Sequence, residues 1–121
     1  MAVNIKITAG EYVFSTTAPH PGVFQAGRNS NVEFTGVTVN TTSGPIFEVH
    51  SPATFTGCTF TSDYPIYVYN TGGEVTVDGG TYIGTKAAIK IDGLSDNANP
   101  SVANVAAGTF KGDVQAVENS Q

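Results

Sequence analysis

The chain has 121 residues, of which 12% are charged, and ten acidic against five basic residues give a net charge of −5. This length fits a single domain covering residues 1–121. The acidic balance and the scattered Lys and Arg residues argue against binding to nucleic acid or to an anionic membrane. The start of the chain lacks the features of a secretion signal, and no apolar run reaches membrane-spanning length. We therefore expect a protein that is made and folded in a cytoplasm.

A six-residue pattern recurs along the chain: an apolar residue, a polar residue, Gly, a free position, Thr and another apolar residue. Clear copies occupy residues 34–39, 55–60 and 77–82, and weaker copies occupy residues 7–12 and 105–110. The copies begin 21 to 28 residues apart. A period of this length, built from short apolar segments, is typical of a solenoid.

In chain order, an alternating apolar pair leads into every copy and a second pair follows it. Residues two apart on a strand share a face, so these pairs point inward. The predicted buried columns are Ile7–Phe34–Phe55–Val77–Val105 and Phe24–Phe47–Ile66–Ile89–Val117. The insertions at residues 15–22 and 92–101 are rich in turn formers, and we expect them to form surface loops. The pattern predicts an all-β fold, a right-handed parallel β-helix of about five rungs.

This repeat resembles that of the pectin-lyase-like superfamily, whose rungs follow the pattern apolar-x-apolar-x-x-Asn-x-Phe. The resemblance covers nearly the whole chain and implies a fold, not an activity. The chain departs from the family at the Asn position, which holds Gly10, Val37, Cys58, Gly80 and Gly108. Gly suits a left-handed turn and the other two residues suit it less, so we expect the bend to differ in the middle copies. For Cys58, the only cysteine, we expect a small packing side chain and no nucleophile.

The sequence contains no convincing catalytic or metal-binding group. The acidic residues Asp63, Asp78, Asp92 and Asp113 do not recur at one ladder position, so no carboxylate pair for acid–base chemistry is predicted. The oxygen-rich segment 92–99 lacks the spacing of a calcium loop. We therefore predict no enzyme activity, no cofactor and no metal.

Two surface features stand out. The first is an outward ladder beside the second column, formed by Gln25, Glu48, Tyr67, Lys90 and Glu118. With Tyr64, Tyr69 and His50 nearby, exposed aromatic rings beside polar groups suit a sugar or a protein partner. The predicted partner-binding residues are Glu48, His50, Tyr64, Tyr67, Tyr69 and Lys90. The second feature is a Thr column, Thr38–Thr59–Thr81–Thr109, of the kind used by ice-binding β-solenoids, although Glu11 interrupts it and Thr is common on exposed strands.

A short acidic solenoid with loop insertions and no capping helices resembles the small β-helical proteins of bacteriophage particles. That resemblance implies a non-catalytic structural protein of the virion, such as a capsid decoration protein, a head fibre or a tail-spike piece. Its partners would be other copies of itself or a capsid or tail protein, bound through the ends of the chain or the tyrosine face. Two alternatives stay open: a carbohydrate-binding module or fragment of a polysaccharide-degrading β-helix enzyme, and an ice-binding solenoid.

Overall fold

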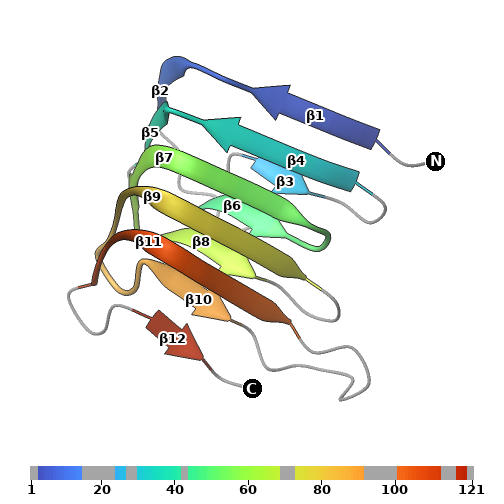
Figure 1. Ribbon diagram of the computed structural model, residues 1–121. Helices are drawn as coiled ribbons and strands as arrows, with labels where there is room; N and C mark the ends of the chain where they lie inside the picture. Colours follow the sequence, from blue (N-terminus) through green and yellow to red (C-terminus); the bar gives the residue numbers. More distant parts are fainter. Residues whose placement is uncertain are drawn as a thin grey trace.

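The computed structural model describes residues 3–14, 24–26, 30–41, 44–68, 73–91, 101–112 and 117–119. In these ranges the chain is all-β, its strands pair in parallel, and none of the residues is helical (Figure 1). One sheet contains β1 (Val3–Ile7), β2 (Gly10–Phe14), β4 (Ser30–Thr35), β5 (Val37–Thr41), β7 (Ala53–Ser62), β9 (Glu74–Gly84) and β11 (Val102–Gly112). The other contains β3 (Phe24–Ala26), β6 (Pro45–Val49), β8 (Tyr64–Val68), β10 (Ile89–Ile91) and β12 (Val117–Asn119).

Both predicted columns have the predicted register. In the first sheet, strand pairing joins Ile7, Phe34, Phe55, Val77 and Val105 in that order. In the second sheet it joins Phe24, Phe47, Ile66, Ile89 and Val117. The register follows from the sequence because the alternating apolar residues fix the buried face and the repeat spacing fixes the partner strand.

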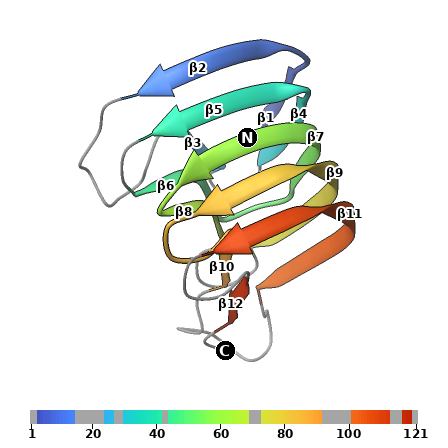
Figure 2. The same cartoon turned by 90° about the vertical axis from the view of Figure 1, so that its left-hand side faces the viewer.

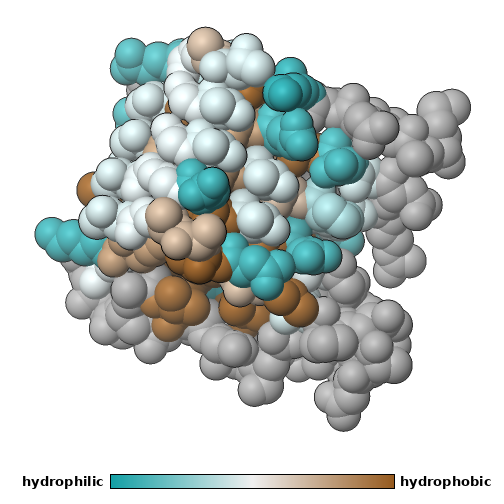
Figure 3. Space-filling view, in the orientation of Figure 1, coloured by the Kyte–Doolittle hydropathy of each residue, from teal (hydrophilic) through white to brown (hydrophobic). Residues whose placement is uncertain are grey.

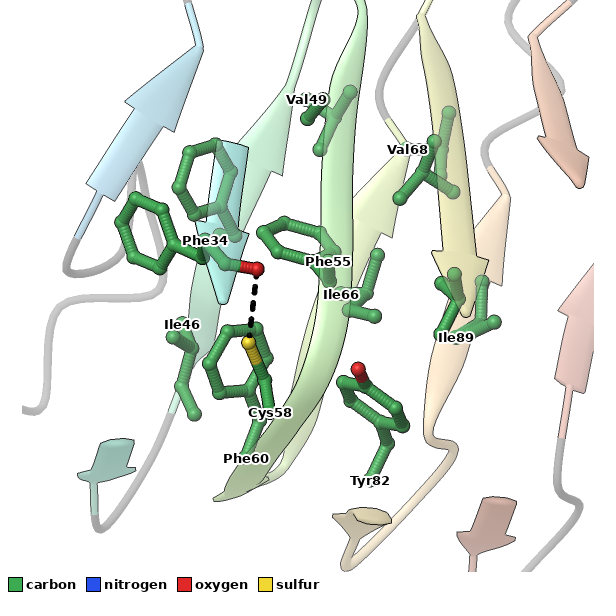
Figure 4. Packing of buried hydrophobic residues seen from close by; sticks show 14 of the residues in the cluster. Phe34, Ile46, Val49, Phe55, Cys58, Phe60, Ile66, Val68, Tyr82 and Ile89 are labelled. Atoms are coloured by element: carbon green, nitrogen blue, oxygen red, sulfur yellow. Dashed lines mark hydrogen bonds between the residues drawn. The ribbon is translucent and has the colours of Figure 1, made fainter. Parts of the chain in front are cut away.

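The core lies between the two sheets and is dense in aromatic rings (Figure 4). Phe55 is fully buried, and its ring centre lies 5.1 Å from those of both Phe47 and Phe60 and 6.0 Å from that of Phe34. The tilted, edge-on arrangement of these pairs suits the charge distribution of aromatic rings. Phe60 also makes an edge-on contact with Tyr82, and the Tyr82 ring stacks on that of Phe110.

The last member of each column is exposed, contrary to the prediction that both columns lie inside. Val105 retains 49% of its accessible surface and Val117 retains 44%. The physical reason is their position: in the described part of the chain, β11 pairs only with β9 and β12 only with β10, so no strand covers their far side.

The bend at the corner of the first sheet differs between copies, as predicted. In the copy that holds Cys58, the residue with a left-handed backbone is the preceding one, Gly57, with φ of +59°. In the copy on β9, Gly80 itself has φ of +103°, and a Cβ built on it would lie 2.2 Å from the Cys58 carbonyl oxygen. Gly80 is therefore required both by its backbone angle and by its close approach to the neighbouring strand.

Candidate functional site

The outward ladder predicted beside the second column has the predicted register. Gln25, Glu48, Tyr67, Lys90 and Glu118 stand opposite one another on β3, β6, β8, β10 and β12. Their chain neighbours at the alternate positions form the second core column. The second sheet thus offers one apolar face to the core and places Glu48, Tyr67 and Lys90 on its other face.

Glu48 and His50 form a closely bonded pair on β6 and just after it. Glu48 is only 3% exposed, and its Oε1 lies 2.6 Å from His50 Nε2. A carboxylate removed from water is costly unless it is bonded, and the imidazole supplies such a bond. The pair is therefore part of the packed structure of this face, with the His50 side chain 19% exposed.

Two lysines hold their ammonium groups over tyrosine rings in the same region. Lys90 Nζ lies 4.8 Å from the centre of the Tyr64 ring and 5.4 Å from that of the Tyr67 ring. Lys86 Nζ lies 5.4 Å from the Tyr64 ring centre. Such contacts are worth about 0.5–1 kcal/mol each at exposed sites. Tyr64 thus has two cations within reach of its ring in a protein that is acidic as a whole.

Lys86 is the member of this cluster that sequence reasoning missed. It follows β9 in a turn where the Lys86 and Ala87 amides donate to the Asp63 carbonyl oxygen, which brings Lys86 beside Tyr64. The Asp63 side chain is bonded in turn, since it accepts from the Gly44 amide and the Thr85 hydroxyl. The contact arises from turn geometry, and the apolar periodicity gives no sign of it.

The prediction that Tyr67 is an exposed aromatic is wrong. Tyr67 does occupy the outward ladder position, but it is only 8% exposed. Its strand neighbours are Glu48 and Lys90, and the Lys90 ammonium stands over its ring, so little of the ring is accessible to a sugar. Tyr64 is half-buried, and Tyr69 lies outside the described residues.

No group of three or more metal-ligating side chains occurs in the described ranges. The oxygen-rich segment 92–99 lies outside them.

Cys58 is buried, as expected for a packing residue. Its thiol donates to the Phe34 carbonyl oxygen at 3.3 Å (Figure 4). Burial raises the pKa of the Cys58 thiol and so disfavours the reactive thiolate.

The Thr column forms in the first sheet, on β5, β7, β9 and β11, which lie side by side in Figure 2. Strand pairing aligns Thr38, Thr59, Thr81 and Thr109. Thr59 and Thr109 are exposed and the other two are half-buried. Beside this column, Ile83 is 37% exposed, so the face is mixed in character.

Comparison with protein-family models, curated proteins and solved structures finds no match to this chain. In the described ranges, no helix is long and apolar enough to cross a membrane.

Proposed function

We propose that this chain is a non-catalytic structural protein that works inside a multimeric assembly. In this proposal its strand pairs are successive turns of a right-handed parallel β-helix of about five rungs. The observation that carries the proposal is the open end at β11 and β12, which no other strand among the described residues covers. There the two core columns end in Val105 and Val117, which are 49% and 44% exposed although their counterparts Val77 and Ile89 are fully buried.

The backbone at this end supports the same proposal. Within the described residues, β11 and β12 each pair on one side only. An open strand edge beside apolar side chains is a template for pairing with another chain. In water these edge groups are hydrated, and pairing them with another strand gains about 0.5–1.5 kcal/mol per hydrogen bond.

The setting we propose is the outside of a bacteriophage particle, where the chain would act as a capsid decoration protein, a head fibre or a tail-spike piece. It would be made in the host cytoplasm and would bind other copies of itself or a capsid or tail protein. Support comes from the parallel all-β architecture and low charge of the chain, which resemble the small β-helical proteins of such particles. Docking would use the open end or the face around Tyr64 and Lys90.

Sedimentation of the purified chain, alone and mixed with virions whose genome encodes it, tests this proposal. We expect the chain to sediment with the particle or as a multimer. A chain that stays monomeric at every concentration and never sediments with the particle would contradict it. A gene that lies among polysaccharide-utilisation genes, away from capsid and portal genes, would contradict the virion setting.

A second candidate is carbohydrate binding, supported by Tyr64 and the two lysines. Half-buried Tyr64 holds Lys86 and Lys90 within 5.4 Å of its ring, an arrangement suited to an acidic sugar. Affinity electrophoresis in neutral and acidic polysaccharides tests this candidate. Retardation of the chain that is lost in Tyr64→Ala and kept in Thr59→Ala would favour it over the structural role alone.

A further inference from the structure

The end of the molecule at β11 and β12 is apolar at its surface. Val102 is 39% exposed, and it lies on the same strand as Val105. In the space-filling view, the largest apolar surface gathers over β11, whereas the strands before it are mostly pale or polar (Figure 3). This end therefore carries apolar side chains beside an open strand edge, the combination that favours strand pairing with another chain.

The opposite end carries the first members of the same columns. Ile7, Tyr12 and Phe24 are partly buried and pack against the core. Within the described ranges, β1 pairs only with β4 and β2 only with β5. β1 and β2 run parallel to the strands that follow them, and their residues Ile7 and Tyr12 face the core. Their outer edges could therefore pair with another strand in the same way as the inner strands pair with their neighbours.

The two ends match in length and register through the corner. Strand pairing relates Ile7 to Val105 and Tyr12 to Phe110 through the intervening strands, with the same number of residues between the two positions. A copy placed beyond β11 would set its Ile7 over Val105 and its Tyr12 over Phe110. Tyr82 already stacks on Phe110 from the other side, with ring centres 5.2 Å apart.

The charges on the outer face also agree with this register. It places Glu11 of one copy opposite Thr109 of the next, and Val13 opposite Lys111. Glu11 and Lys111, both exposed, then become diagonal neighbours of opposite charge on facing strands. Lys6, which pairs with Glu33 at 3.7 Å in its own chain, would face the neutral Asn104, so no like charges meet on these strands.

We propose that copies of this chain associate head to tail, with β1 and β2 of one copy pairing in parallel with β11 of the next and β3 pairing with β12. The proposal rests on the assembly role proposed above and names its partner as a second copy. Because the two surfaces are different, the contact does not close on itself, and it produces linear stacks whose length grows with concentration.

Analytical ultracentrifugation of the whole chain over a wide concentration range tests the pairing. We expect the mass to rise in steps of one chain. Val105→Lys places a charge at the predicted contact, where the side chain is already half-exposed, and should weaken association at least tenfold. Thr59→Lys places the same charge on the exposed outer face, away from both ends, and should associate like the natural chain. Circular dichroism confirms that both variants are folded.

A charge exchange gives a second, independent measurement. Glu11→Lys and Lys111→Glu should each weaken association by about two- to fivefold, and the double variant should recover it, because the opposite pair is restored across the contact. If each single substitution weakens association and the double variant does not recover it, the proposed register is wrong.

The outcomes separate this inference from the proposed function. A chain that binds the virion but never self-associates overturns head-to-tail pairing and leaves the structural role standing. Self-association that Val105→Lys does not change also overturns it, because the contact then lies elsewhere. A chain that neither self-associates nor binds the particle overturns both.

Discussion

Replacing Phe55 by Ala should cost as much stability as the most damaging core truncations of a phenylalanine. The side chain is fully buried, and three aromatic rings lie around it with centres 5.1–6.0 Å away. Removing a buried Phe side chain costs about 3–5 kcal/mol in total, and the loss of three ring pairs places this site in the upper part of that range. We therefore expect a loss of about 4–5 kcal/mol. For 121 residues this corresponds to a fall in Tm of about 16–20 °C.

Thr56→Ala is the matched control, because Thr56 follows Phe55 on the same strand and its side chain points away from the core. Thr56 is half-buried, and its carbonyl oxygen accepts from the Gly36 amide at 2.9 Å, a backbone bond that the substitution keeps. We expect a change within about 0.5 kcal/mol. Guanidinium unfolding followed by circular dichroism measures both variants. Equal losses at the two positions, or a loss below about 1 kcal/mol for Phe55→Ala, would refute the assignment of Phe55 to the core.

Two further predictions concern the corner and the buried tyrosine. Gly80→Ala should lose about 3 kcal/mol or more, because the new Cβ would overlap the Cys58 carbonyl oxygen at a strained φ. A Cβ at Gly57 would have no atom within 4 Å, so Gly57→Ala should lose only about 1–2 kcal/mol. Equal losses for Gly80→Ala and Gly57→Ala in the same unfolding assay would contradict this explanation. Burial raises the pKa of Tyr82 above its ordinary value of 10, so the unfolded chain loses this proton first and stability falls as the pH rises above about 10. Tyr82→Phe should lose about 1 kcal/mol of stability at pH 7, because it removes the hydrogen bond from the Tyr82 hydroxyl to the Gly79 carbonyl oxygen. Its urea midpoint should fall less steeply above pH 10 than that of the natural chain. Parallel pH curves for the two proteins would contradict this.

The register of the sheets could be predicted because the signals for it are local. Apolar residues two apart determine which side of a strand is buried, and copies of one motif identify the partner strand. Phe34 and Phe55 illustrate this, since both belong to one predicted column and both are buried in register. The change of bend at Cys58 was also predictable, because a side chain with a Cβ does not favour a left-handed backbone.

The exposure of individual side chains could not be predicted in this way. Tyr67 has an outward position in the alternation, but its accessible surface depends on a lysine over its ring and on acidic and basic neighbours in adjacent strands. Lys86 joins the same cluster through backbone bonds in a turn, which no periodic pattern encodes. Val105 has an inward position, yet it is exposed because burial also requires a strand on its far side.

The uneven distribution of aromatic rings has a consequence for how the molecule opens. The ring contacts among Phe34, Phe47, Phe55 and Phe60 lie in β4, β6 and β7, midway along the sheets, whereas Val105 and Val117 at the last strands are half-exposed. When strands contact mainly their neighbours, local opening begins where these contacts are fewest and proceeds inward. Backbone amides in β7 should therefore exchange hydrogen with solvent most slowly, and those in β12 fastest, so that the chain keeps an ordered centre while its end strands open and re-form.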